Sequence, residues 1–164
     1  MPTMPPVILN NTPLVALWTL QHWDLLKNLF GYVLIPTAVK VEFLATHTNR
    51  RQQDFADSPW IQTAVLDNPR HALSYIGLDI GEAEVLALAV ERSARLVIID
   101  ERKGRQYAKR LGLPMTATLG VLLLAKQQGL IPSVTGLIYQ LQKAGLYFSP
   151  QWIERFLTMA QETQ

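Results

Sequence analysis

The chain has 164 residues, of which 49% are hydrophobic, and this predicts one domain (residues 1–164) with a sizeable core. It has no cysteine, which excludes disulfides and thiolate metal sites and is compatible with a cytoplasmic location. The net charge is only +2, no apolar run reaches the roughly 20 residues of a membrane span, and the N-terminus does not resemble a secretory signal, so no membrane association is expected.

Short apolar strands alternate with longer helices along the chain. The expected strands are 7–9, 32–35, 61–66, 96–99 and 113–115. The helices are expected after Thr12, around 23–30, from Pro36, after Gly81, and over about 101–111, 119–128, 133–144 and 151–161, whereas the polar segment 46–58 has no clear assignment. This alternation predicts an α/β fold: a three-layer α/β/α domain with a central, mainly parallel sheet, on which the C-terminal helices (about 133–161) pack.

The stretch from residue 77 to residue 101 predicts a helix whose two glutamates differ in direction. With about 100° of rotation per residue, Glu82 shares a face with Val85 and Leu86. We therefore expect Glu82 to point into the protein. Glu84 falls on the opposite face, where we expect it to meet water.

The strand that follows this helix ends on two acids, Asp100 and Glu101. In open α/β sheets, functional groups gather at the carboxyl ends of strands and at the start of the next helices, so Asp100 and Glu82 are expected on the same edge. A purely structural interpretation remains open for each acid. Asp79 and Glu82 fit a capping box, and Asp100 could cap the helix that follows it.

Carboxylate and amide side chains are expected to gather at this edge: Asn10, Glu42, Glu82, Asp100 and Glu101. Such oxygen ligands suit Mg²⁺ or Mn²⁺, and an ion held there can lower the pKa of a water molecule and stabilise charge on a phosphate. Hydroxyl groups on the same rim would come from Thr12, Thr116 and Thr118. Each of these residues could instead serve only as a helix cap.

A basic segment directly follows the two acids and contains Arg102, Lys103, Arg105, Lys109 and Arg110. Such a helix is often only a solvated face, but beside a metal site it favours contact with a phosphate backbone, to which Arg50 and Arg51 could add. The sequence shows no spaced aromatic-basic motif for RNA. The three histidines lack zinc-site spacing, and neither a nucleophile elbow nor a phosphate-binding glycine loop is present.

Five sequence blocks in series resemble the PIN-domain family over about residues 6–148. They read N-N-T-P-L-V-A-L, I-P-x-A-V-x-x-E, G-E-A-E-V-L-A-L-A, L-V-I-I-D-E-R-K-G-R and L-P-M-T-A-T-L-G-V-L-L-x-A-K. The nearest resemblance is to the compact prokaryotic, VapC-toxin-like branch. It implies a Mg²⁺- or Mn²⁺-dependent ribonuclease, often the toxin of a toxin–antitoxin pair, that has a small antitoxin protein as partner and frequently forms homodimers.

Matched by motif, the family's four acidic positions fall on Asn10, Glu42, Glu82 and either Asp100 or Glu101. The catalytic residues would be Glu42, Glu82 and Asp100. The family's usual residue at the first position is aspartate, and the neutral Asn10 should weaken a divalent site. A second hypothesis is therefore a catalytically weakened or inactive module that binds RNA or a protein, and a third is a small-molecule binder on a Rossmann-like sheet.

Overall fold

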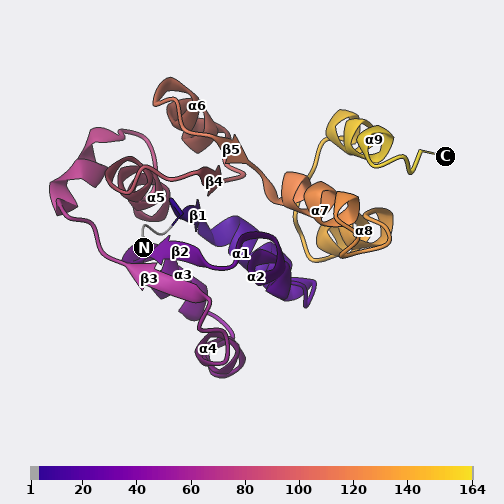
Figure 1. Cartoon of the computed structure of the whole chain (residues 1–164), viewed down its shortest axis with the longest axis horizontal. Helices are drawn as coiled ribbons and strands as arrows, with labels where there is room; N and C mark the ends of the chain where they lie inside the picture. The colour runs from indigo at the N-terminus through magenta and orange to yellow at the C-terminus, as the bar shows by residue number, and fades with distance from the viewer. Residues whose placement is uncertain (1–3, 164) are drawn as a thin grey trace.

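The computed structural model describes residues 4–163, and its centre is a five-stranded, all-parallel sheet (Figure 1). The strand order is β3-β2-β1-β4-β5. The strands are β1 (Val7–Leu9), β2 (Val33–Pro36), β3 (Ile61–Ala64), β4 (Leu96–Ile98) and β5 (Met115–Thr116). The parallel sheet that the sequence predicted is confirmed.

Helices flank this sheet and complete a three-layer α/β/α fold, with α5 on one side and α1 and α2 on the other (Figure 1). The α-helices are α1 (Asn11–Thr19), α2 (Asp24–Phe30), α3 (Thr37–Leu44), α4 (Thr48–Ala56), α5 (Ile80–Glu91), α6 (Arg102–Arg110), α7 (Thr118–Gln127), α8 (Thr135–Lys143) and α9 (Pro150–Met159). A 3₁₀ helix, η1 (Pro69–Ser74), precedes α5. Within residues 4–163, no helix is long and apolar enough to cross a membrane.

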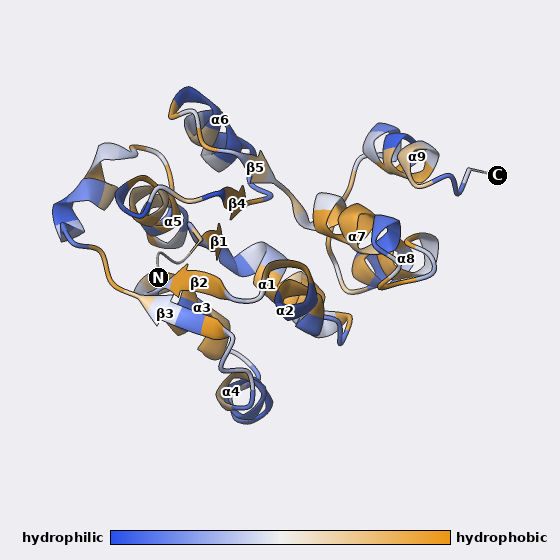
Figure 2. Ribbon diagram, viewed as in Figure 1, coloured by the Kyte–Doolittle hydropathy of each residue, from blue (hydrophilic) through white to orange (hydrophobic). Residues whose placement is uncertain are grey.

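The core forms where the apolar strands β1 and β4 pair. Val7, Ile8 and Leu9 are fully buried, and Ile8 lies opposite Val97. Strands that are covered on both faces need apolar residues at every position, which explains these continuous runs. Apolar residues accordingly gather on the strands and on α1, α5 and α7, whereas α4 and α6 are mostly hydrophilic (Figure 2).

Helix α5 is buried almost all round, and this corrects the expected direction of one glutamate. Glu84 is half-buried rather than exposed to water on a wet face. Its Oε1 accepts a hydrogen bond from the backbone N–H of Ala38 at 3.1 Å, so it satisfies a free amide in the first turn of α3. The expected rotation about the helix was right, but a second helix covers that face.

Two helix starts also differ from the sequence prediction. Helix α1 begins at Asn11 with Asn10 in the capping position, so Thr12 lies inside the helix and does not cap it. Pro36 is the last residue of β2 and caps α3, whereas the sequence predicted it as the first helical residue. In both cases the strand turns into the helix without a loop: Asn10 alone separates β1 from α1, and no residue separates β2 from α3.

The segment without an assignment, 46–58, contains α4, and one of its arginines is a core residue. Arg51 is 7% exposed, and its Nη1 donates to the carbonyl oxygen of Phe43 at 2.8 Å. Its guanidinium lies 4.8 Å from the ring centroids of both Trp18 and Phe43. Arg51 therefore fastens α4 to α1 and α3, and the expectation that it adds to a surface basic patch was wrong.

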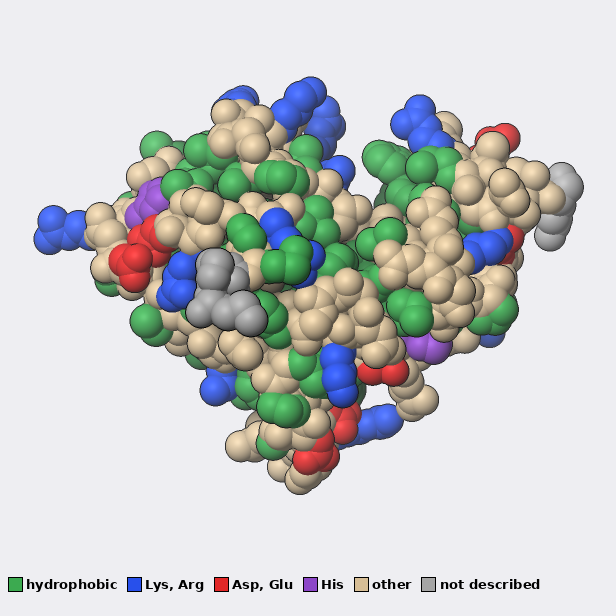
Figure 3. Space-filling model, viewed as in Figure 1, with side chains coloured by type: hydrophobic (Ala, Val, Ile, Leu, Met, Phe, Trp, Pro, Cys, Tyr) green, Lys and Arg blue, Asp and Glu red, His purple; other side chains and the backbone are tan. Residues whose placement is uncertain are grey.

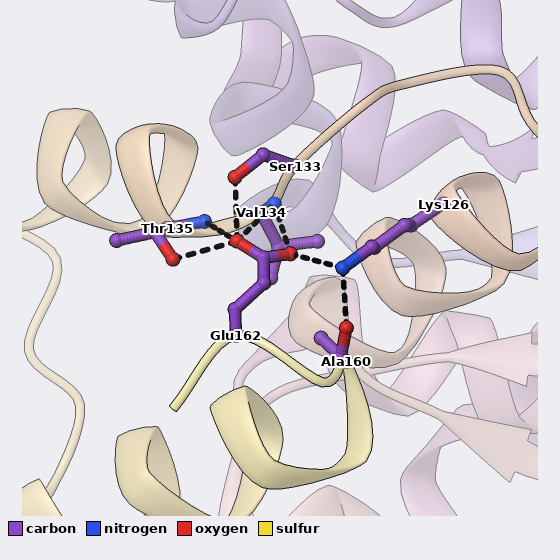
Figure 4. Close-up of polar contacts among 6 residues, drawn as sticks. All are labelled: Lys126, Ser133, Val134, Thr135, Ala160 and Glu162. Carbon is purple, nitrogen blue, oxygen red and sulfur yellow. Dashed lines mark hydrogen bonds and ion pairs between the residues drawn. The ribbon is translucent and has the colours of Figure 1, made fainter. Parts of the chain in front are cut away.

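The C-terminal helices are held by Glu162, whose carboxylate accepts hydrogen bonds from α7 and from the segment that starts α8 (Figure 4). Lys126 Nζ donates to it at 2.8 Å, and the backbone N–H groups of Val134 and Thr135 donate at 2.9 and 3.0 Å. Burial alone would raise the pKa of Glu162, but bonds from Lys126, Ser133 and Thr135 lower it far below its ordinary value. Glu162 thus joins the end of α9 to α7 and to the start of α8.

Candidate functional site

The candidate site lies where β1 and β4 end and α5 begins. The backbone N–H of Asn10 donates to the carbonyl oxygen of Ile98 at 3.0 Å, so the carboxyl ends of β1 and β4 are direct neighbours. Asn10 is 5% exposed, and its side chain projects toward the first turn of α5. The edge that the sequence predicted as a gathering point is therefore the place where three elements meet.

Three side-chain oxygens surround Gly81, the second residue of α5. Measured from the point that a Cβ atom on Gly81 would occupy, Glu42 Oε2 lies at 3.2 Å, Asp79 Oδ1 at 3.5 Å and Asn10 Oδ1 at 3.6 Å. Any side chain at position 81 would fill the space between these oxygens. The glycine therefore keeps open a small space lined with oxygen atoms from α3 and from the residues that cap α1 and α5.

Glu82 lies beside this space and is only 9% exposed. Its pKa is raised to about 7, chiefly because burial disfavours the charged carboxylate. Repulsion from Asp79, a hydrogen bond with the Asp79 side chain and the charges of Glu101 and Glu42 raise it further. Four acidic side chains thus act on one another at this site.

Glu42 stands at the solvent-exposed mouth of the site. Its pKa is raised by partial burial and by the charge of Asp79, and a hydrogen bond from Asn11 partly offsets this effect. The Oδ1 atom of Asn11 is buried and has no hydrogen-bond partner among residues 4–163. An unpaired buried oxygen next to crowded carboxylates is suited to receive a ligand that donates a hydrogen bond or carries positive charge.

The two acids that follow β4 point in different directions. The Asp100 carboxylate accepts the backbone N–H of Thr118 at 2.7 Å and its hydroxyl at 2.5 Å, so Asp100 caps α7 and not the helix that follows it in sequence. Glu101 makes no capping hydrogen bond to α6, and its charge raises the pKa of Glu82. Glu101 therefore belongs to the acidic group more directly than Asp100 does.

The donor atoms of this site are of the kind that binds a divalent cation. Every side-chain donor around Gly81 is a carboxylate or amide oxygen, the donor type that Mg²⁺ and Mn²⁺ prefer. Across the described part of the chain, no three His, Cys, Asp or Glu side chains form a ready-made metal-binding group. The chemistry of the site fits a hard cation whose coordination includes amide oxygens and water, as is usual for Mg²⁺.

The basic residues of α6 flank the acidic group. Arg102, Lys103 and Lys109 are exposed, whereas Arg105 is half-buried and donates from Nη1 to the carbonyl oxygen of Ile99 at 3.0 Å. The Nζ atom of Lys103 lies 3.9 Å from the point that a Cβ of Gly77 would occupy, so Lys103 lies over the loop leading to α5. Positive charge therefore lies on the approach to the site.

The three predicted threonines differ in their surroundings. Thr12 is exposed on α1, and Thr116 is half-buried, with its hydroxyl packed so closely against Gly120 that a Cβ atom there would clash. Thr118 is fully buried, and its hydroxyl is bonded to Asp100. Thr118 therefore holds Asp100 in place, and Thr12 is the most accessible of the three.

Two residues of the site were not among the predicted ligands. Asp79 was interpreted only as a helix cap, and it does accept the backbone N–H of Glu82 at 2.8 Å, but its Oδ1 also faces the space at Gly81. The spacing D-x-G-E was the available signal, because an acid that caps a helix lies next to the helix's first inward-facing side chain. Asn11 gave no signal, since its position depends on where α1 begins.

Comparison with known proteins assigns the chain to a family. No curated protein matches it. The family profile described as a PIN domain matches residues 6–162, nearly the whole chain and more than the stretch over which the motifs resemble the family. The fold, the acidic group at the sheet edge and this match agree, and the chain belongs to the PIN-domain family, whose fold is of the nuclease type.

Proposed function

We propose that this protein is a Mg²⁺- or Mn²⁺-dependent ribonuclease of toxin–antitoxin type. The observation that carries the proposal is the convergence of Glu42, Asp79 and Asn10 oxygens around Gly81, beside the buried Glu82. As part of the same proposal, residues 1–164 act as one domain in the cytoplasm, as a homodimer, under the control of a small antitoxin protein.

The proposed ligands are Asn10, Glu42, Glu82, Glu101 and Asp100. Both oxygens of Asp100 accept hydrogen bonds from Thr118, so Asp100 would bind an ion through the lone pairs that these two bonds leave free. An ion bound to them would lower the pKa of a water molecule and neutralise charge on the phosphate. Without an ion, repulsion from the neighbouring acids and burial raise the pKa of Glu82 to about 7, and a bound cation would favour its charged carboxylate. Hydrolysis forms a bond from water oxygen to phosphorus and breaks the bond from phosphorus to the leaving sugar oxygen.

A second candidate function rests on Asn10. At 5% exposure its neutral amide occupies the position of the family's usual aspartate, and one missing negative charge weakens the attraction for a divalent ion. On this alternative, the protein binds RNA or a protein partner at the same edge and does not turn it over. Binding would then be salt-sensitive, since it would depend on phosphate contacts with α6.

Cleavage of a mixed pool of single-stranded RNA tests the two candidates directly. Wild-type protein is compared in Mn²⁺ and in EDTA, alongside Glu82→Gln. We expect cleavage in Mn²⁺ alone and a loss of about 100-fold or more in Glu82→Gln, because an amide cannot supply the carboxylate's charge to the ion.

The matched control is Glu84→Gln on the same helix. Its amide oxygen can still accept the N–H of Ala38, so the fold and the cleavage rate should stay close to those of the wild type. Cleavage that persists in EDTA, or equally in Glu82→Gln, would contradict the nuclease proposal. Salt-sensitive RNA binding by a folded wild-type protein that cleaves nothing would favour the second candidate.

A further inference from the structure

A groove of about 820 Å³ opens next to the acidic group, between α6 and the segment that leads into α9. Asp100 and Thr12 are among the residues that line it. Figure 3 shows it as a notch in the upper rim of the molecule, between the surface over α6 and the surface over α9. A ligand lying in this groove would reach the candidate site at one end.

One wall of the groove is basic. Helix α6 lines it with Arg102, Arg105 and Lys109, and Arg102 and Lys109 are exposed. Neither of the two ion pairs found within residues 4–163 involves α6, so no acidic side chain described there neutralises these residues. Exposed positive charges in a row are suited to successive phosphates of a nucleic-acid backbone.

The facing wall is aromatic. Tyr147 is 83% exposed, and Trp152, in the first turn of α9, is 49% exposed. The Trp152 ring stacks on Phe156 with ring centroids 5.4 Å apart, which fixes its plane. The capping bond from the Trp152 N–H to Ser149 Oγ (3.2 Å) fixes the start of this helix. Large aromatic rings left open to solvent and held by their own neighbours are suited to stack on bases.

We infer that this groove binds single-stranded RNA, with the phosphates on α6 and the bases stacked on Tyr147 and Trp152, and directs the strand to the acidic group. The two walls come from segments about forty residues apart in sequence. A single strand is required because duplex bases are stacked on one another and cannot offer their faces to a side chain. This inference rests on the proposed ribonuclease function, for which it names two residues that stack on the bases of the substrate.

Equilibrium binding tests the groove without requiring turnover. Fluorescence anisotropy is measured in EDTA with a labelled single-stranded RNA of mixed sequence, the same RNA as a duplex, and an abasic ribose-phosphate strand of equal length. We expect Tyr147→Ala and Trp152→Ala each to raise the Kd for single-stranded RNA about tenfold, the usual effect of losing one stacked base. Both variants should bind the abasic strand as the wild type does.

The controls separate stacking from charge and from folding. Tyr139→Ala removes a tyrosine that is 57% exposed on α8 but lies outside the groove, and its Kd should equal that of the wild type. Lys109→Ala should weaken binding to both single strands and reduce the salt dependence of the Kd, because it removes one phosphate contact. Lys143→Ala, on α8 and outside the residues that line the groove, should change neither.

The outcomes distinguish this inference from the proposed function. An unchanged Kd for single-stranded RNA in both aromatic variants would refute RNA binding in the groove, even if cleavage by the wild type were metal-dependent. Aromatic variants that keep RNA affinity but change the sedimenting mass would also overturn it, since the groove would then be a protein interface. The wild-type protein could also cleave no RNA while both aromatic variants bind single-stranded RNA more weakly than it does. That result would support RNA binding in the groove and contradict the proposed ribonuclease activity.

Discussion

Glu82 and Glu162 are both poorly exposed glutamates, but their surroundings are opposite. Around Glu82 stand the acidic Asp79, Glu101 and Glu42, and its pKa rises to about 7. Around Glu162 stand an ammonium group, hydroxyls and backbone N–H groups, and its pKa falls. The difference shows which carboxylate stabilises the fold. The charge of Glu162 is stabilised by donors within the protein, whereas Glu82 has acidic neighbours and could be stabilised by a positively charged ligand.

The largest expected effect comes from removing the satisfied carboxylate. Glu162→Ala leaves Lys126 and the amides at the start of α8 without their acceptor, and we expect a loss of about 3 kcal/mol in the free energy of unfolding at pH 7. Because folding lowers the pKa of Glu162, its contribution is present above its ordinary value of 4.5 and is lost as the pH falls below it. Urea denaturation at pH 7 and pH 3 measures both.

The control for this variant is Glu154→Ala, which removes an exposed carboxylate from α9. Its effect should stay within about 0.5 kcal/mol at both pH values. A cost for Glu162→Ala that is small at pH 7, or as large at pH 3 as at pH 7, would show that the hydrogen bonds to Glu162 do not hold the C-terminal helices.

The sequence predicted the parallel sheet and the direction of Glu82 because both follow from local periodicity. Continuous apolar runs such as 96–99 predict strands buried on both faces, and the helical repeat carries Glu82 to the same side as Val85 and Leu86. The family resemblance is confirmed over residues 6–162. The site residues remain predictions, although the structure brings Asn10, Glu42 and Asp79 around one point.

What the sequence could not predict depends on contacts between distant segments. Glu84 meets the start of α3, and Asp100 meets Thr118, so neither partner lies within reach of a local pattern. Arg51 looks like a surface charge until the rings of α1 and α3 are placed around it. The sequence shows no motif that combines the aromatic and basic residues of the groove. The basic residues lie in α6, and the aromatic residues lie about forty positions later in the chain.

The second prediction concerns Glu82. Removing this carboxylate should raise the free energy of unfolding, whereas removing Glu162 should lower it. The pKa of Glu82 is about 7 in the folded protein and 4.5 ordinarily, so the folded state binds more protons and loses stability as the pH rises from about 4.5 to 7. Without divalent ions, Glu82→Gln should therefore be more stable than the wild type by about 2 kcal/mol at pH 8 and equal to it at pH 4. Thermal denaturation across this pH range measures the difference.

Adding Mn²⁺ sharpens the same comparison. The ion should raise the Tm of the wild type at pH 8 and leave that of Glu82→Gln nearly unchanged, since the variant lacks the charge that draws the ion. A wild-type protein equally stable at pH 8 and pH 5 in EDTA would contradict the account of Glu82 as a carboxylate held against repulsion.

The smallest expected effect comes from adding a charge to the acidic group. Asn10→Asp places a further carboxylate beside Glu42 and Asp79, so the ion-free protein should lose about 1 kcal/mol at pH 8. Mn²⁺ should then stabilise the variant more than the wild type, and RNA cleavage should increase. Asn28→Asp, at an exposed position of α2, is the control and should show neither change. An equal Mn²⁺ response in wild type and Asn10→Asp would mean that residue 10 does not face the ion, although its amide oxygen faces Gly81.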